Sequence, residues 1–397
     1  MARIGIYGGT FNPPHVGHMQ AAKFSIGALG LDRLLLIPDR IAPHKVIPSG
    51  TATPQQRLEM VTLAAAGMER GVVSDMELLR SGPSYTYLTI LELKQQYPDD
   101  ELILLMGTDM FLSFLSWKNP QIILENADIG VFYRGDRNEE EQIAKQAELL
   151  RTMGGVVHLI ENPVTQISST VLRSLLVFGS AGDYLPAGVE DYVRKEGLYG
   201  TKESYKNLSL QELEECLPAF IKPERMAHVL GCRDMALELA KRWGADPEKA
   251  QRAALLHDIT KALDGTPQLT LCRGLGILLD DFSKNHPKTL HAFTGSLVAE
   301  RIFGEKSDVV QAIASHTTGK PGMNTLEQII YIADMMEMTR TYPGVEKLRS
   351  LAFSDLEAAV KMGISNTIEI LKARGEDIHP DGQATLEWFN ERTKEKC

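Results

Sequence analysis

Two groups of residues in this 397-residue chain have types and spacings that could do chemistry. The first is close to the start, in the run Gly8-Gly9-Thr10-Phe11-Asn12-Pro13-Pro14-His15-Val16-Gly17-His18. Glycine lets backbone N–H groups approach a ligand closely, and the amino end of a helix favours anions. His15 and His18 are three positions apart, so they would share one face of a helix. The run predicts a phosphate site in preference to a Gly-Pro turn that carries two surface histidines.

A second piece of this site is expected far along the chain, in Ile167-Ser168-Ser169-Thr170-Val171-Leu172-Arg173. The segment follows an apolar run and could begin a helix, where hydroxyls and free N–H groups can hold phosphate oxygens. Arg173, one turn further on, would add a fixed positive charge. Taken alone, the segment is as typical of an ordinary helix N-cap.

The other group is a set of histidines and aspartates in the carboxy-terminal half. Each lies on or at the end of an expected helix, and helices packed in a bundle can direct such side chains to one interior point. Imidazoles and carboxylates without thiolates suit iron, manganese, magnesium or zinc in an open catalytic site, and the cluster would be costly to bury without a metal. The expected ligands are His228, His257, Asp258, His291, His316 and Asp334, with His286 as a rival of His291.

The elements that must position the first group alternate between short apolar strands and helices. This alternation, with nearly continuous apolar strands, predicts a doubly wound, Rossmann-like α/β domain with a parallel sheet covered on both faces. The expected strands are Ile4–Tyr7, Arg33–Pro38, Leu102–Met106, Asp128–Tyr133 and Val156–Ile160, with helices over Pro54–Gly67, Tyr87–Gln96 and Glu139–Met153.

From about Leu208 onward the pattern is helical, which predicts an all-α domain. The expected organisation is an α/β domain over residues 1–200, a polar linker over 201–207 and a helical domain over 208–397. The expected helices are Ser209–Leu217, Arg225–Trp243, Pro247–Leu263, Leu290–Phe303, Thr325–Met338 and Ser354–Arg374.

Composition excludes several classes of function. The formal net charge is −10, which weakens the case for a nucleic-acid or membrane-surface binder, since these need a basic face. No apolar run is long enough to span a membrane, and the start of the chain lacks the pattern of a signal peptide. The dispersed cysteines Cys216, Cys232, Cys272 and Cys397 fit a reducing cytoplasm and argue against disulfides or a thiolate zinc site. Each cysteine is expected to be a small core or surface residue.

Together, the amino-terminal motifs resemble the nucleotidyltransferase superfamily and, more narrowly, bacterial nicotinate-nucleotide adenylyltransferase. The resemblance covers nearly all of residues 1–200. It rests on the Gly8–His18 run, Ala42-Pro43-His44-Lys45, Ser84-Tyr85-Thr86, Leu104–Asp109, Trp117-Lys118 and Ile167–Arg173. It implies in-line attack of nicotinate mononucleotide on the α-phosphorus of ATP, giving deamido-NAD and pyrophosphate, with Mg²⁺ accompanying ATP.

The same resemblance implies the roles of the site residues. His15, His18, Lys45 and Arg173 would act on the phosphates. ATP would be bound by these histidines and Arg173 together with Gly8, Gly9, Thr10, Phe11, Gly107, Asp109, Ser168, Ser169 and Thr170. Lys45, Tyr85, Thr86 and Trp117 would bind the pyridine nucleotide. Another adenylyl acceptor, nicotinamide mononucleotide or phosphopantetheine, is the alternative.

The pair His257-Asp258 in His257-Asp258-Ile259-Thr260-Lys261 is the signature of the HD superfamily of metal-dependent phosphohydrolases. With Leu290-His291-Ala292, His316–Met323 and Ile330–Asp334, the region from about Leu208 to Phe389 resembles the HD-type, symmetrically cleaving bis(5′-nucleosyl)-tetraphosphatase. That family converts diadenosine tetraphosphate to two ADP. The resemblance implies two divalent ions, iron first and manganese or magnesium as alternatives, with Asp258 as their bridge and Lys261 near the reacting phosphate.

These inferences predict a bifunctional cytoplasmic enzyme that acts on small nucleotides, with no nucleic-acid or membrane partner, and they leave a homo-oligomer open. The alternative for the second domain is a regulatory module that binds a dinucleoside polyphosphate without hydrolysing it. The intact set of metal-binding side chains favours hydrolysis, since a binding module would not need all of them.

Overall fold

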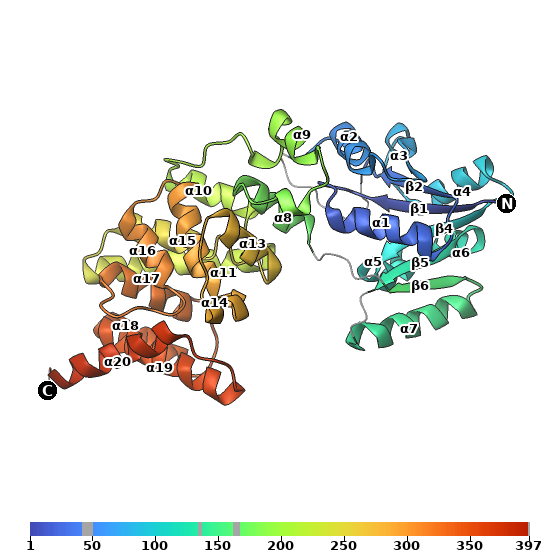
Figure 1. The fold of residues 1–397 in the computed structure, drawn as a ribbon. Helices are drawn as coiled ribbons and strands as arrows, with labels where there is room; N and C mark the ends of the chain where they lie inside the picture. The colour runs from blue at the N-terminus through green and yellow to red at the C-terminus, as the bar shows by residue number, and fades with distance from the viewer. Residues whose placement is uncertain (42–50, 134–136, 162–166, 396–397) are drawn as a thin grey trace. The chain divides into compact units, whose positions relative to one another are not determined.

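The computed structural model describes residues 1–41, 51–133, 137–161 and 167–395. The chain divides into two compact units. The first comprises Met1–Val177 and Ala181–Lys202, and the second comprises Phe178–Ser180 and Glu203–Cys397. The first unit is built on a sheet, whereas the described residues of the second form helices and contain no strand (Figure 1).

A six-stranded parallel sheet with the order β3-β2-β1-β4-β5-β6 is the centre of the first unit. Its apolar side chains alternate between two cores, so that Ile4 and Ile6 lie in one and Leu34 and Leu36 in the other. The doubly wound parallel sheet that the sequence predicts is therefore confirmed, although the three-residue edge strand β3 was missed. The strands are β1 Arg3–Gly9, β2 Arg33–Pro38, β3 Gly71–Val73, β4 Glu101–Gly107, β5 Asp128–Tyr133 and β6 Val157–Glu161.

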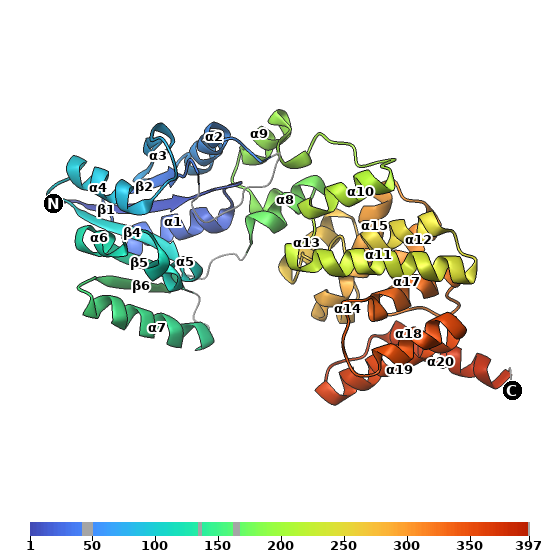
Figure 2. The ribbon, with the colours of Figure 1, turned by 180° about the vertical axis from the view of Figure 1, so that it is seen from behind.

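Helices cover both faces of this sheet (Figure 2). Helices α1 and α2 contribute to the core around Leu34, and α4, α6 and α7 contribute to the core around Ile4. The helices of the unit are α1 Val16–Ala28, α2 Pro54–Ala65, α3 Met76–Leu79, α4 Thr86–Gln96, α5 Thr108–Leu112, α6 Pro120–Asn126, α7 Arg137–Thr152, α8 Ser169–Val177 and α9 Val189–Glu196.

The order of the strands changes direction at β1, which pairs with β2 on one side and β4 on the other. Ile6 is in register with Leu35 of β2 and with Leu104 of β4. The carboxyl ends of β1 and β4, at Gly9 and Gly107, therefore lie at the same edge of the sheet. In open α/β sheets, ligands bind at this edge and at such a switch point.

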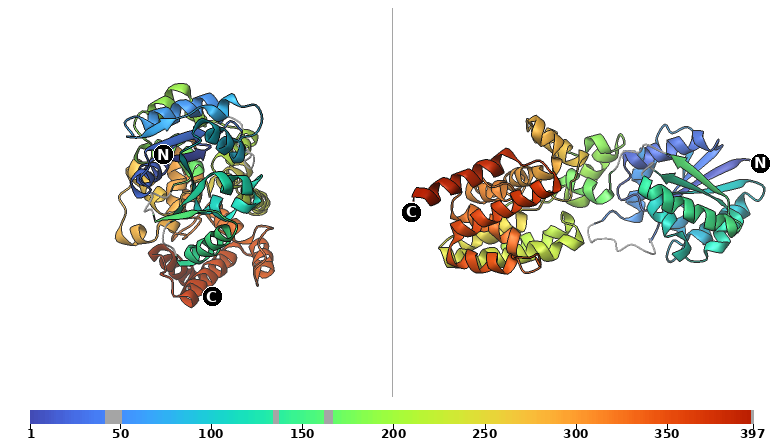
Figure 3. Two further views of the ribbon diagram at one scale, coloured as in Figure 1. Left: turned by 90° about the vertical axis from the view of Figure 1, so that its right-hand side faces the viewer. Right: turned by 90° about the horizontal axis from the view of Figure 1, so that it is seen from below.

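The second unit is a helical bundle, whose helices run from yellow-green to red in Figure 3. Within it, α12 and α17 contact each other, and each of them also contacts α11 and α16. An all-helical domain after the sheet domain is thus confirmed for the described residues. The helices are α10 Leu210–Cys216, α11 Pro223–Trp243, α12 Pro247–Leu256, α13 Thr266–Gly274, α14 Asp281–Asn285, α15 His291–Arg301, α16 Ser307–Ser315, α17 Thr325–Met336, α18 Val345–Ser354, α19 Leu356–Arg374 and α20 Pro380–Glu395.

Helix α12 is shorter than the sequence predicts. The expected helix ran to Leu263, but the helix ends at Leu256 and is followed by turns. In these turns the N–H of residue 259 donates to the carbonyl of 256 at 3.1 Å, and that of 261 donates to the carbonyl of 258 at 2.9 Å. Tight turns of this kind take the place of helical bonding, and they put two consecutive side chains, His257 and Asp258, into the interior of the bundle.

Part of the segment expected to be a linker is packed into the second unit. Tyr205 is buried, and its ring centroid lies 5.5 Å from that of Phe220 and 5.6 Å from that of Phe303. The division between the two compact units falls after Lys202. Because the residues around Tyr205 are polar, the sequence pattern did not indicate that this ring packs into the second unit.

Two findings on the described residues concern membrane-spanning helices and the state of the cysteines. None of the described helices combines the length and the apolar character needed to cross a membrane. The described cysteines Cys216, Cys232 and Cys272 are free thiols.

Candidate active sites

The loop after β1 ends in two histidine rings that fix each other. His15 is the N-cap of α1, and its Nδ1 accepts the backbone N–H of His18 at 3.3 Å. The Nδ1 of His18 accepts the backbone N–H of His15 at 3.2 Å, and the rings stack with centroids 3.5 Å apart. Because each Nδ1 is an acceptor, these hydrogen bonds assign the proton of each neutral ring to Nε2. Burial lowers the pKa of His15 to about 4, so this ring is a neutral donor at pH 7.

A buried guanidinium holds the backbone of this loop. Arg57, on α2, is 1% exposed. Its Nη1 donates to the carbonyl oxygen of Thr10 at 2.7 Å and to Oδ1 of Asp39 at 3.2 Å, and its Nη2 donates to the carbonyl oxygen of Asp39 at 2.7 Å. The Thr10 hydroxyl donates to Oδ2 of Asp39 at 2.7 Å. The loop after β1 is thus held by Asp39, which follows β2, and by Arg57 of α2.

Asn12 connects the loop to two distant parts of the first unit. Its Oδ1 accepts the hydroxyl of Tyr199 at 2.7 Å, and its carbonyl oxygen accepts Nη1 of Arg173 at 3.0 Å. Tyr199 has φ of 56°, a left-handed backbone that is uncommon for a tyrosine. Arg173, which the sequence analysis assigned to the phosphates, therefore does lie at the loop that carries the two histidines.

The other residues expected to bind ATP lie at element ends. Gly107 ends β4, and Asp109 is in the first turn of α5. Ser169 begins α8, and the Oγ of Ser168 just before it accepts the N–H of Val171 at 3.2 Å, as an N-cap does. Outside the described residues lie Lys45 and the side chain of Thr170.

The residues expected at the pyridine nucleotide come from two segments. Tyr85 is the N-cap of α4, and Thr86 is the first residue of that helix. The Nζ of Lys118 lies 4.3 Å from the ring centroid of Tyr85, so the segment around Trp117 reaches the start of α4. The ring of Trp117 also packs on Phe114, with centroids 5.4 Å apart, and is partly buried against the core.

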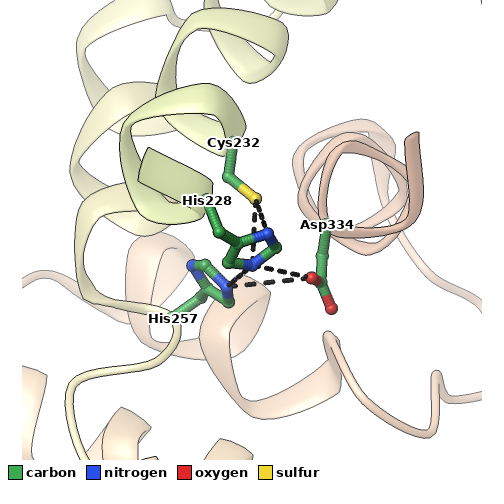
Figure 4. A group of neighbouring side chains, drawn as sticks. All are labelled: His228, Cys232, His257 and Asp334. Carbon is green, nitrogen blue, oxygen red and sulfur yellow. Dashed lines mark hydrogen bonds and ion pairs between the residues drawn. The ribbon is translucent and has the colours of Figure 1, made fainter. Parts of the chain in front are cut away.

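In the second unit, the predicted ligands surround the buried carboxylate of Asp258. Its Oδ2 lies 3.4 Å from Nε2 of His257 and 3.8 Å from Nε2 of His228. The Oδ1 of Asp334, on α17, lies 3.1 Å from Nε2 of His228. Figure 4 shows His228, His257 and Asp334 directed toward one another, with Cys232 beside His228.

The other oxygen of Asp258 faces a second pair of imidazoles. Oδ1 lies 3.5 Å from Nε2 of His291 and 3.9 Å from Nε2 of His316, and these two nitrogens are 3.2 Å apart. Oδ1 is buried without a hydrogen-bond partner among the described groups, which a cation at this point would remedy. Imidazole nitrogens and carboxylate oxygens suit iron, manganese or zinc, so the donor set fits a divalent cation.

The four imidazoles are oriented through their other ring nitrogen. Three of them donate from Nδ1, at 2.7 Å, to the carbonyl oxygen three residues earlier in the chain. These pairs are His257 with Ala254, His291 with Lys288, and His316 with Ile313. The Nδ1 of His228 instead bonds Oε1 of Glu337 at 3.0 Å. A bond on Nδ1 leaves Nε2 as the ligand atom, as in metal-bound histidines generally.

The pKa shifts differ among the groups of the cluster. Burial is the main cause that lowers the pKa of His316 to about 4 and that of His291 to about 3. Burial alone would raise the pKa of Asp258, but the charges and hydrogen bonds of His257 and its neighbours hold that pKa well below its usual range. Neutral His291 and His316 and an ionised Asp258 can coordinate a cation without losing protons first. Burial would lower the pKa of His257, but the charges of Asp258 and Asp334 raise it, so this ring holds its proton more tightly and must release it to coordinate.

Three cationic side chains lie at the edge of the cluster. The Nε of Arg225 donates to Oδ2 of Asp258 at 2.6 Å, and Nη2 of Arg340 donates to Oδ1 of Asp334 at 2.9 Å. The Nζ of Lys261 lies 3.0 Å from Nε2 of an imidazole in the second pair. Positive charge is therefore available next to the carboxylates, where a polyphosphate would need it.

In the comparison with known proteins, a different family model matches within each unit. The family model described as cytidylyltransferase-like matches residues 6–175, and the one described as HD domain matches residues 225–339. A probable nicotinate-nucleotide adenylyltransferase from Aeromonas salmonicida is 41% identical over 211 residues, which cover 50% of this chain and 97% of the relative. The chain belongs to the nicotinate-nucleotide adenylyltransferase family. A relative of the same description from Dictyoglomus thermophilum is 38% identical over 198 residues, covering 50% of this chain and 99% of its own.

A solved structure is also similar to part of this chain. A protein from Clostridium acetobutylicum, described as a predicted HD superfamily hydrolase involved in NAD metabolism, is 35% identical to this chain. It covers 47% of this chain and 98% of its own, with a TM-score of 0.45.

Sequence reasoning missed several residues of both sites of the adenylyltransferase. Arg225 lies three positions before His228 on α11, so the shared face of that helix could have indicated it. Arg340 follows the end of α17, and no spacing signalled it. The supports of the amino-terminal loop, Asp39 and Arg57, look in the sequence like an ordinary strand end and helix residue.

The rival histidine lies outside the cluster. His286 is the residue after α14, and its Nε2 bonds Oδ2 of Asp377 at 3.0 Å. Its ring stacks on Phe282, with centroids 4.1 Å apart. His291, at the start of α15, occupies the position that faces Asp258.

Proposed function

We propose that this adenylyltransferase is bifunctional, and that its first unit transfers the adenylyl group of ATP to nicotinate mononucleotide. The observation that carries this assignment is the identity of 41% over nearly the whole length of a relative described as a probable nicotinate-nucleotide adenylyltransferase. The geometry of the loop after β1 supports it. The acceptor phosphate would attack the α-phosphorus of ATP in line, and deamido-NAD and pyrophosphate would leave.

The placement of the residues supports the roles proposed for them. The Nε2–H groups of His15 and His18 would donate to phosphate oxygens, and Arg173 would supply a permanent charge at the same loop. Such a site needs no covalent intermediate, because positioning and charge neutralisation account for most of the catalysis in phosphoryl-type transfers. Tyr85 and Trp117 are proposed to contact the pyridine nucleotide, with the indole stacked on its ring.

The test of the first activity compares acceptors. Full-length protein is incubated with ATP, Mg²⁺ and each of nicotinate mononucleotide, nicotinamide mononucleotide and phosphopantetheine. Pyrophosphate release and the nucleotide product are then measured. The expected result is the highest kcat/KM with nicotinate mononucleotide, and equal or faster turnover of phosphopantetheine would refute the assignment.

The second proposed activity is symmetrical hydrolysis of diadenosine tetraphosphate by the HD domain. The observation that carries it is the buried carboxylate of Asp258, because each of its two oxygens lies close to imidazole nitrogens that could bind a metal ion. His228, His257, Asp258 and Asp334 would hold one divalent ion, and Asp258, His291 and His316 a second. Bound ions of this kind polarise a phosphoryl group and activate water.

The side chains around the cluster would orient the substrate. Arg225 and Arg340 now bond the carboxylates of Asp258 and Asp334, and they are placed to bind phosphate oxygens when ions neutralise those carboxylates. Lys261, whose pKa is lowered mainly by burial, lies next to the second pair of imidazoles. Cations on both sides suit a chain of phosphates more than a single phosphate.

Product identity and metal content together test this assignment. Full-length protein loaded with Fe²⁺ or Mn²⁺ is incubated with diadenosine tetraphosphate, and the products are separated by chromatography. Two ADP per substrate are expected, together with two equivalents of bound metal. Formation of ATP and AMP would refute symmetrical cleavage, and an uncut substrate in the metal-loaded protein would favour a binding module.

A further inference from the structure

A thiol lies among the predicted metal ligands of the second unit, although the residue pattern indicated no sulfur ligand there. Cys232 is one helical turn after His228 on α11 and is 1% exposed. Its Sγ lies 3.5 Å from Nε2 of His228, the atom that faces the other ligands. The possible ligand atoms of Cys232, His228, His257 and Asp334 all lie within 4.8 Å of one another (Figure 4). Cys232 is buried, as expected of a small core residue, but that expectation does not explain why its sulfur lies beside Nε2 of His228.

Two separations in the group match those of neighbouring donors on one ion, whereas Nε2 of His257 and Oδ1 of Asp334 are further apart, at 4.0 Å. With metal–nitrogen bonds near 2.1 Å and metal–sulfur bonds near 2.3 Å, neighbouring ligand atoms of a four- or five-coordinate ion are roughly 3.0–3.8 Å apart. The Sγ of Cys232 and Nε2 of His228 are 3.5 Å apart, and the Nε2 atoms of His228 and His257 are 3.3 Å apart. The carbonyl oxygen of Ala333, a contact of the thiol on α17, is 3.9 Å away. A thiol that is buried with so long a hydrogen bond is poorly satisfied by the protein alone.

The two halves of the cluster differ at this point. Beside His291 and His316 there is a hydroxyl, Oγ1 of Thr317, at 3.2 Å and 3.3 Å from their Nε2 atoms. The described residues place no sulfur in that half. One half of the cluster therefore offers a soft donor and the other a hard one, and softness of the donor is what separates iron and zinc from magnesium and manganese.

We propose that Cys232 is a thiolate ligand of the ion held by His228, His257, Asp258 and Asp334, which makes this position selective for a thiophilic divalent cation. This inference rests on the proposed metal centre of the HD domain. On binding, the S–H bond breaks and its electron pair stays on sulfur, while the proton passes to water. The resulting thiolate then donates a lone pair to the metal ion. The ion between Asp258, His291 and His316 is then the more weakly held and the more exchangeable of the two.

Cobalt gives a direct spectroscopic test in the full-length protein. The protein is stripped with a chelator and titrated with Co²⁺ alone, and the absorption spectrum is recorded. The first equivalent is expected to produce a near-ultraviolet thiolate-to-Co²⁺ charge-transfer band as well as visible d–d bands. Cys232→Ser should lose the charge-transfer band and bind the first Co²⁺ about 10–100-fold more weakly, the range typical when a metal-supporting residue is replaced.

Matched variants make the outcomes distinguishable. Cys272→Ser removes a thiol of the same unit that is also buried but lies on α13 outside the cluster, and it should retain both bands. Cys232→Ala, checked by circular dichroism for its helical content, separates loss of the ligand from loss of the fold. Visible bands without a charge-transfer band in the unmodified protein would overturn the role of Cys232 and leave the metal centre intact. Absence of any Co²⁺ spectrum would overturn the metal centre itself.

Discussion

The two candidate sites of this protein are held in place in opposite ways. In the first unit, the loop from Gly8 to His15 is the proposed phosphate site, and side chains such as Arg57 hold its backbone in place. In the HD domain, side chains are offered to the ligand, and carbonyl oxygens such as that of Ala254 hold them in place. A loop site should therefore be sensitive to replacements of residues that never touch substrate, whereas the cluster should be most sensitive to replacement of the donors.

The largest expected effect is that of Asp258→Asn on hydrolysis. The amide cannot serve two ions as a carboxylate does, so hydrolysis of diadenosine tetraphosphate should fall by about 10³-fold or more, several kcal/mol of lost charge stabilisation. Adenylyl transfer should be unchanged. Chromatography of ADP and elemental analysis of bound metal measure both consequences.

The control for that experiment is His286→Ala, since His286 bonds Asp377 outside the cluster. This variant should keep its metal and its hydrolytic rate. If Asp258→Asn lost both activities in a folded protein, the two sites would not be independent.

In the first unit, His18→Ala is expected to lower the kcat of adenylyl transfer by about 10²-fold. The variant loses an oriented N–H donor to the phosphates and the acceptor that fixes the N–H of His15 at 3.2 Å. Hydrolysis by the HD domain should not change. Steady-state assays of both reactions on one preparation check this, and normal transfer would show that the loop is not the phosphate site.

These expectations also show what the sequence could predict. The residue types of the cluster identified its six predicted members, because metal ligands come from a short list of side chains and the helical periodicity placed each on a helix or at its end. Five of the six strands of the sheet were found for a similar reason, since a buried parallel strand is a run of apolar residues. The support of the loop could not be found, because Arg57 and Tyr199 reach it only through the tertiary fold.

The end of α12 was also beyond prediction. Residues 257–263 continue the apolar pattern of the helix, and the sequence contains no glycine or proline to end it there. The helix ends because the bundle takes His257 and Asp258 inward and the Thr260 hydroxyl bonds the carbonyl oxygen of His291 at 3.0 Å. Contacts with a distant helix decide this boundary, and local propensity does not contain them.

A pH titration would sharpen the comparison through His15. Its pKa is lowered to about 4 in the folded protein, whereas an exposed imidazole has a pKa near 6.5. The unfolded chain therefore binds this proton more tightly, and the free energy of unfolding of the first unit should fall as the pH drops from about 6.5, by about 3 kcal/mol near pH 4.

Calorimetry between about pH 4 and 7 measures this loss, and the transition of the first unit is the one that added ATP moves to higher temperature. His15→Asn retains a good N-cap without a titrating ring, so its stability should depend less on pH in this range. An equal pH dependence in that variant would contradict the assignment to His15.

The smallest expected effect is that of Tyr199→Phe. The change leaves Oδ1 of Asn12 buried without its hydroxyl donor, a cost of about 1–3 kcal/mol. The KM for ATP should rise by about 10-fold, with a smaller change in kcat, because the loop is misplaced and no group that touches the phosphates is removed. Tyr192→Phe, on α9, is the matched control, and an equal effect there would show a general loss of stability.

The bond between Asn12 and Tyr199 joins positions that are 187 residues apart. A ribosome that adds roughly 5–20 residues per second needs on the order of 10–40 s to make the second partner after the first. During that interval the loop of the nascent chain lacks the hydrogen bond that the Tyr199 hydroxyl later donates to Asn12. Tyr199 is therefore among the last residues of the first unit to be synthesised, three positions before the unit ends at Lys202. Any shortened version of the chain must extend past Tyr199 if the loop around Asn12 is to have this hydrogen bond.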